Sequence, residues 1–69
     1  MNKIKSIRVL KGIKQKEMAE ILGITPQYLS RLEKKEADLK ISTLKQIAKV
    51  LDVGIKDLLE EDIYNEQHK

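Results

Sequence analysis

The stretch that decides the fold covers residues 15–34 and reads QKEMAEILGITPQYLSRLEK. Its apolar residues recur at helical spacing on both sides of Gly23, which predicts two short helices, over 15–22 and about 25–34. Gly23 suits a sharp turn between them, because glycine adopts a positive φ without the steric cost that a Cβ brings. The stretch therefore predicts two helices that meet at a steep angle.

The start of the second of these helices is marked by Thr25 and Pro26. A threonine hydroxyl can accept a hydrogen bond from the first turn, and proline at the next position lacks only an N–H that would have no partner. Leu29 and Leu32 anchor one face of this helix on the core, so the opposite face is free to enter the major groove of DNA. The residues expected on that face are Gln27, Tyr28, Ser30, Arg31 and Lys34.

Three further helices are predicted on either side of this stretch by the same spacing. The first covers about residues 3–11 and ends at Gly12, another covers 41–51, and the last begins after Gly54. The polar segment 34–40 is expected to be an exposed loop. The residues expected to face inward from these helices are Ile4, Ile7, Leu10, Ile41, Leu44, Ile47, Ala48, Leu51, Ile55, Leu58 and Leu59.

The fold class predicted for the chain is all-α, a compact domain of five helices. With 69 residues the chain holds one domain at most, and no alternating apolar run indicates a strand. We assign the domain to residues 1–59. Residues 60–69 form an acidic tail that either extends the fifth helix or frays.

Charge is distributed unevenly along the chain, which has a net charge of +3. Residues 1–59 hold thirteen basic and seven acidic residues, whereas residues 60–69 hold four acidic residues and one lysine. A basic body with an acidic tail suits a polyanionic partner, although a lysine-rich surface can also be simply solvated.

The chain lacks the residues that several functional classes of protein require. The chain has no cysteine and a single histidine, His68, near its C-terminus, and it shows no glycine-rich phosphate loop. We therefore expect no enzyme activity, metal or cofactor, and no pocket for a small-molecule ligand in so short a chain. No apolar run approaches the roughly 20 residues of a membrane span, and none resembles a signal peptide. The sequence thus predicts a cytoplasmic protein that does not associate with membranes.

The order and spacing of these marks resemble the helix-turn-helix domain of the phage repressor and Cro family, also called the xenobiotic-response-element type. The resemblance covers about residues 4–59 and rests on the whole pattern. It implies a lambda-repressor-like fold and a sequence-specific, double-stranded DNA-binding transcriptional regulator, acting as a repressor with residues 25–34 in the major groove. The residues that carry it are Gln15, Glu17, Ala19, Gly23, Ile24, Ser30, Arg31, Leu32, Glu33, Thr43, Leu44, Ile47, Ala48, Leu51, Asp57, Leu58 and Leu59.

The resemblance also implies roles for individual residues. Arg8 and Glu33 match an internal ion pair that orients the recognition helix, and Gln15 matches a glutamine that braces this helix and touches a phosphate. The positions implied to contact bases are Pro26, Gln27, Tyr28 and Arg31. Those implied to contact phosphates are Lys14, Gln15, Thr25, Ser30, Lys34 and Lys40. The alternative is that Gln27 and Arg31 are ordinary solvent-facing residues and that Tyr28 packs on a neighbouring helix.

Four residues depart from the family pattern. Pro26 stands where many relatives have a polar base-reading side chain, so readout would depend more on Tyr28, DNA shape or methyl contacts. Lys35 replaces a usual glycine, which leaves two possibilities: the helix runs on, or Lys35 adopts an unusual backbone conformation. Leu39 replaces a usual proline, and Lys40 replaces a usual Ser or Thr helix cap.

A single recognition helix offers little surface, so the resemblance implies a homodimer on an inverted repeat. The expected interface is the exposed part of the fifth helix and tail, at Leu58, Leu59, Ile63 and Tyr64. The alternative function is a protein-interaction module or antitoxin that uses the same fold, with the acidic tail as its contact segment.

Overall fold

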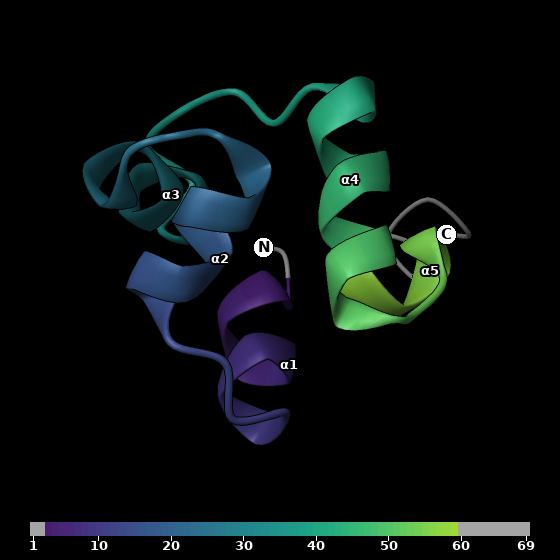
Figure 1. The fold of residues 1–69 in the computed structure, drawn as a ribbon. Coiled ribbons are helices and arrows are strands. Elements are labelled where there is room, and N and C mark those ends of the chain that lie inside the picture. Colours follow the sequence, from purple (N-terminus) through teal and green to yellow (C-terminus); the bar gives the residue numbers. More distant parts are fainter. Residues whose placement is uncertain (1–2, 60–69) are drawn as a thin grey trace.

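The structure is a computed structural model that describes residues 3–59, and these form an all-α fold (Figure 1). The boundaries of the first four helices and the start of the fifth differ from the sequence-based prediction by one residue at most, and the predicted five-helix fold class is confirmed. The helices are α1 (Ile4–Leu10), α2 (Gln15–Leu22), α3 (Pro26–Glu33), α4 (Ile41–Leu51) and α5 (Ile55–Leu58).

The core lies where α4 meets the helices that surround it. Helix α4 packs against α1, α2 and α5, and α2 packs against α3, so α4 is the central support of the domain (Figure 1). Helix α3 is joined to α4 by a long connection and presents its other side to solvent. The buried apolar residues are Ile4, Met18, Ala19, Leu29, Leu32, Leu44, Ile47, Ala48, Leu51 and Leu58.

Three leucine and isoleucine residues that we expected to face inward are exposed. The exposed fraction is 85% for Leu10, 65% for Ile41 and 48% for Leu59. Leu10 ends α1, Ile41 begins α4, and Leu59 follows the last residue of α5. Helical spacing identifies the inward face correctly, but at the ends of a helix this face extends past the neighbouring elements.

The two ends of the described chain meet at the edge of the core. The backbone N–H of Lys3 donates a hydrogen bond of 2.9 Å to the carbonyl oxygen of Leu58. Helix α5 ends at Leu58, because Leu59 has extended backbone angles. Among residues 3–59, no helix is long and apolar enough to cross a membrane.

Candidate nucleic-acid interface

The turn between α2 and α3 sets the direction of α3, and its geometry matches the expectation from the sequence. Gly23 has a φ of 72° and caps the C-terminus of α2, and its N–H donates to the carbonyl of Glu20 at 3.1 Å. Thr25 then begins α3, because its Oγ1 accepts the N–H of Tyr28 at 3.0 Å and Pro26 occupies the first helical position. The turn is therefore closed by hydrogen bonds on both sides.

Helix α3 has one buried face and one polar face. Leu29 and Leu32 are buried, whereas Gln27, Arg31 and Lys34 are exposed. Tyr28 and Ser30 are half-buried at the border between the two faces. The polar face therefore presents an amide, a guanidinium and an ammonium group on one rigid element.

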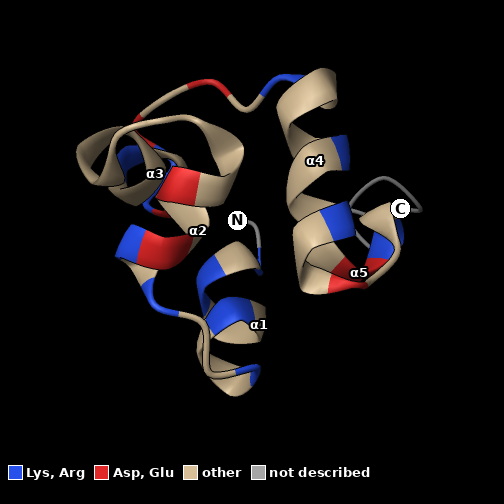
Figure 2. Cartoon of the chain, viewed as in Figure 1, with Lys and Arg blue, Asp and Glu red and all other residues tan. Residues whose placement is uncertain are grey.

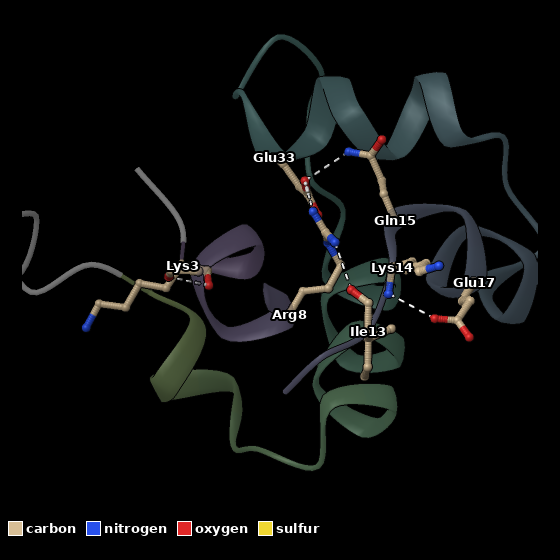
Figure 3. A network of polar contacts seen from close by, with 8 residues as sticks. Lys3, Arg8, Ile13, Lys14, Gln15, Glu17 and Glu33 are labelled. Atoms are coloured by element: carbon tan, nitrogen blue, oxygen red, sulfur yellow. Dashed lines mark hydrogen bonds and ion pairs between the residues drawn. The ribbon is translucent and has the colours of Figure 1, made fainter. Parts of the chain in front are cut away.

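A buried ion pair connects α3 to α1. Nε of Arg8 lies 2.7 Å from Oε2 of Glu33, and Nη2 of Arg8 lies 3.2 Å from Oε1 (Figure 3). The two side chains are only 7% and 2% exposed. Nη1 of Arg8 also donates to the carbonyl oxygen of Ile13 at 2.8 Å. A bidentate contact of this kind fixes orientation as well as distance, so it holds α3 in one position relative to α1.

Gln15 extends this network to α2. Its Nε2 donates to Oε1 of Glu33 at 3.1 Å, and Gln15 is the first residue of α2 (Figure 3). In the same turn, Oε1 of Glu17 accepts the backbone N–H of Lys14 at 3.0 Å. Glu33 thus receives hydrogen bonds from both α1 and α2. The phosphate contact implied for Gln15 stays a prediction.

Open hollows lie at both ends of the polar face of α3. One of about 350 Å³ is lined by Gln15, Pro26, Gln27 and Ser30. The other, of about 440 Å³, is lined by residues of α3 and of the α3–α4 connection, among them Tyr28, Arg31, Lys35, Glu36, Asp38 and Lys40. Residues expected to contact bases and phosphates therefore line both hollows.

The α3–α4 connection settles the two possibilities that we left open for Lys35. Helix α3 ends at Glu33 with Lys34 as its C-cap, and Lys35 adopts a φ of 63°. Nη2 of Arg31 donates to the carbonyl oxygen of Glu36 at 3.1 Å. Lys40 caps the N-terminus of α4 without a side-chain hydrogen bond. Leu39, in place of a proline, is half-buried against the core.

The other residues expected to contact phosphates lie at helix ends around α3. Lys14 immediately precedes α2, Thr25 precedes α3, Lys34 follows α3 and Lys40 precedes α4, and all four are exposed. Figure 2 shows basic residues on α1, on α3 and where α4 begins. Such an arrangement would suit a DNA duplex whose sugar-phosphate backbone passes these residues while α3 lies in the major groove.

Two contacts of this surface have no signal in the sequence. The carbonyl oxygens of Ile13 and Glu36 accept hydrogen bonds from Arg8 and Arg31, respectively. Backbone acceptors of this kind depend on the path of the chain and not on residue type, so only the structure identifies them. Within residues 3–59, no group of His, Cys, Asp or Glu side chains could hold a metal ion.

The structure corrects the dimer interface that we expected from the sequence. Leu58 is fully buried in the core of its own chain and has no surface to offer to a partner. Leu59 is 48% exposed and is available. Ile63 and Tyr64 lie outside the described residues.

Comparison with known proteins gives a consistent result. The family model described as helix-turn-helix matches residues 4–58. The control protein C.SmaI of Serratia marcescens is 34% identical over 65 residues, which are 93% of this chain and 77% of that protein. The HTH-type transcriptional regulator SinR of Bacillus subtilis is 37% identical over 60 residues, 86% of this chain, and the match covers about half (54%) of SinR.

Solved structures of transcriptional regulators also resemble this chain. The clp gene regulator ClgR of Corynebacterium glutamicum superposes with a TM-score of 0.75 at 30% identity, covering 78% of this chain and 70% of ClgR. SinR, the master regulator for biofilm formation, solved in complex with DNA, gives a TM-score of 0.73 at 36% identity, covering 83% of this chain and 92% of that one. With its matching fold, its polar α3 and these relatives, the chain belongs to the helix-turn-helix family of the xenobiotic-response-element type and is a DNA-binding transcriptional regulator.

Proposed function

We propose that the chain recognises a specific DNA sequence by placing α3 in the major groove, and that it represses transcription from that site. The observation that carries the proposal is the polar face of α3, at Gln27, Arg31 and Lys34, on a helix held in place by the ion pair between Arg8 and Glu33. A recognition helix must be rigid before it binds, because ordering it at the moment of binding would cost affinity. We place the site of action in the cytoplasm, because a bacterial chromosome, which a DNA-binding regulator must reach, lies there.

In this proposal, the base-contacting residues are Pro26, Gln27, Tyr28 and Arg31 of α3. Arg31 reads a guanine through two hydrogen bonds, and Gln27 reads an adenine in the same way. Pro26 has no N–H to donate, so its ring makes apolar contact with a base edge, such as a thymine methyl group. Tyr28, which is half-buried at the border of the polar face, contacts a thymine methyl group or the neighbouring DNA phosphate. Phosphate contacts come from Lys14, Gln15, Thr25, Ser30, Lys34 and Lys40.

The proposed binding unit is a homodimer on an inverted repeat. One α3 contacts few base pairs, and two copies related by a two-fold axis would double this contact. Leu59 supports an interface at this end of the domain, because it is an exposed leucine directly after α5. Ile63 and Tyr64, which we also expect at this interface, lie outside the described residues.

The test is selection of binding sites from a pool of random DNA duplexes at physiological salt. The purified chain, Arg31→Ala and Lys49→Ala would be compared in parallel. Lys49 is an exposed cation on α4 and serves as the control for loss of one charge. We expect the unmodified chain and Lys49→Ala to enrich the same inverted repeat. With Arg31→Ala, one base pair of each half-site should lose its preference, at a cost of about 1–3 kcal/mol.

Two other results would change the proposal. If Arg31→Ala weakened binding to all sequences equally, Arg31 would be a phosphate contact and not a reader of bases. If no sequence were enriched and only weak, salt-sensitive binding remained, the chain would instead be a protein-interaction module or antitoxin that keeps this fold.

A further inference from the structure

Four of the described residues have a positive φ, and one of them is unusual. Gly12 and Gly23 pay no steric cost for this conformation, and Asp52, with a φ of 57°, belongs to a residue type that tolerates it. Lys35, with a φ of 63°, has a long side chain, and within residues 3–59 this side chain makes no hydrogen bond that would compensate for the conformation. At this position glycine would be favoured by the backbone alone.

The conformation of Lys35 is imposed by the hydrogen bonds on either side of it. Its own N–H donates to the carbonyl of Leu32 at 3.2 Å, and the N–H of Glu36 donates to the carbonyl of Arg31 at 2.7 Å. The guanidinium of Arg31 donates in return to the carbonyl of Glu36 at 3.1 Å. These hydrogen bonds fix the backbone at Lys35. The Lys35 side chain is therefore attached at a defined position beside the C-terminus of α3.

The surroundings of Lys35 are suited to an anion. Lys35 is exposed and lines the hollow of about 440 Å³ together with Arg31 and Lys40, so the lining includes three cations. Glu36 and Asp38 line the same hollow, but within residues 3–59 no carboxylate pairs with the ammonium of Lys35. The hollow also adjoins the polar face of α3, since Arg31 belongs to both.

We propose that Lys35 binds a phosphate of the DNA backbone beside the recognition helix, and that this contact is the reason why a lysine occupies a position favourable to glycine. The inference rests on the proposed function. Strained backbone conformations tend to persist where they serve binding. Lys35 is thus a positioning residue for α3: it reads no base, and it fixes how far along the groove the helix lies.

The test separates the charge of Lys35 from its backbone strain by comparing three substitutions. Lys35→Gln removes the charge but keeps the strain, Lys35→Gly removes both, and Lys35→Arg keeps both. Lys49→Gln is the control for loss of one positive charge elsewhere. Each variant would be measured for thermal stability, and for affinity to a labelled mixed-sequence DNA duplex over a range of salt concentrations.

We expect Lys35→Gln and Lys35→Gly to bind DNA equally weakly. For both, the slope of log affinity against log salt should fall by about 0.9, the value for one phosphate contact. Lys35→Arg should keep the slope, and so should Lys49→Gln. Lys35→Gly should melt at a higher temperature than Lys35→Gln, because glycine relieves the strain. A variant that gains stability while losing DNA affinity is the signature of this proposal.

Unchanged affinity and slope in Lys35→Gln and Lys35→Gly would overturn the inference while leaving the proposed function intact. If Lys35→Gln lost thermal stability but kept its DNA affinity and salt slope, the role of Lys35 would be to stabilise the negative C-terminal end of the α3 dipole. If the unmodified chain itself bound no DNA in a salt-dependent manner, both the proposed function and this inference would fail.

Discussion

At the scale of single residues, Glu33 is the group on which the orientation of α3 depends. It accepts hydrogen bonds from Arg8 and Gln15, which come from two different helices, and its side chain is only 2% exposed. A carboxylate removed from water in this way is stable only while its partners remain. The orientation of the recognition surface therefore depends on the buried pair of Arg8 and Glu33, neither of which is among the proposed DNA contacts.

Replacing Arg8 with alanine should test this dependence. We expect Arg8→Ala to lower the free energy of unfolding by about 3–5 kcal/mol, because the carboxylate of Glu33 would be left buried without its cation. The double variant Arg8→Met with Glu33→Leu should recover a large part of this loss, since no unpaired charge remains. Urea denaturation of the variants measures both effects. Equal stability of Arg8→Ala and the unmodified chain would show that the pair contributes little.

The residue scale also shows where sequence reasoning stops. Gly23 and Thr25 were predictable, because the chemistry of a turn and of a helix cap is local to a few neighbouring positions. For Lys35 the sequence left two conformations open, since the choice depends on whether α3 ends at Glu33. The roles of the base- and phosphate-contacting residues stay predictions that follow from family resemblance.

At the scale of elements, the turn between α2 and α3 determines whether the two helices act as a unit. Gly23 has a φ of 72°, and a Cβ added there would have no atom within 4 Å. A substitution would therefore meet no clash, and its cost would come from the backbone conformation alone.

We expect Gly23→Ala to cost about 1–2 kcal/mol of stability, the penalty of the left-handed region for a residue with a Cβ. Gly23→Asn should cost less, because asparagine tolerates this region. Thermal unfolding followed by circular dichroism would measure both variants. If the two destabilised the protein equally, the cost would have another source than the left-handed backbone.

Most helix boundaries were predictable to within one residue, whereas the exposure of helix ends was not. Leu10 and Ile41 fit the apolar spacing of their helices, yet both are largely exposed. Spacing gives the direction of a side chain relative to its helix axis. Which neighbour lies in that direction is decided by tertiary packing, and this explains why Leu58 is buried although we expected part of it at a dimer interface.

At the scale of the whole molecule, the proposed dimer should appear as a gain in affinity for paired half-sites. A duplex with two inverted half-sites should bind on the order of a hundredfold more tightly than a duplex with one, because the second contact becomes intramolecular. Leu59→Lys should abolish this gain but leave binding to one half-site unchanged. Leu10→Lys, an equivalent change at a leucine that is 85% exposed, is the control.

Fluorescence anisotropy on the two duplexes, together with sedimentation of the free protein, would check this prediction. If both Leu59→Lys and Leu10→Lys lost the gain in affinity for paired half-sites, the loss would be a general effect of added charge. If both variants kept this gain, the dimer contact would lie elsewhere.

The hydrogen bond between Lys3 and Leu58 suggests that the domain would tolerate circular permutation. Because residues 3 and 58 are adjacent, a short linker could join the two ends of the described domain, and new termini could be opened in the exposed connection between α3 and α4. In such a circular permutant the recognition helix would be the last element of the chain instead of the third. The order of elements along the sequence would change while their arrangement in space, and with it the DNA-facing surface, would be kept.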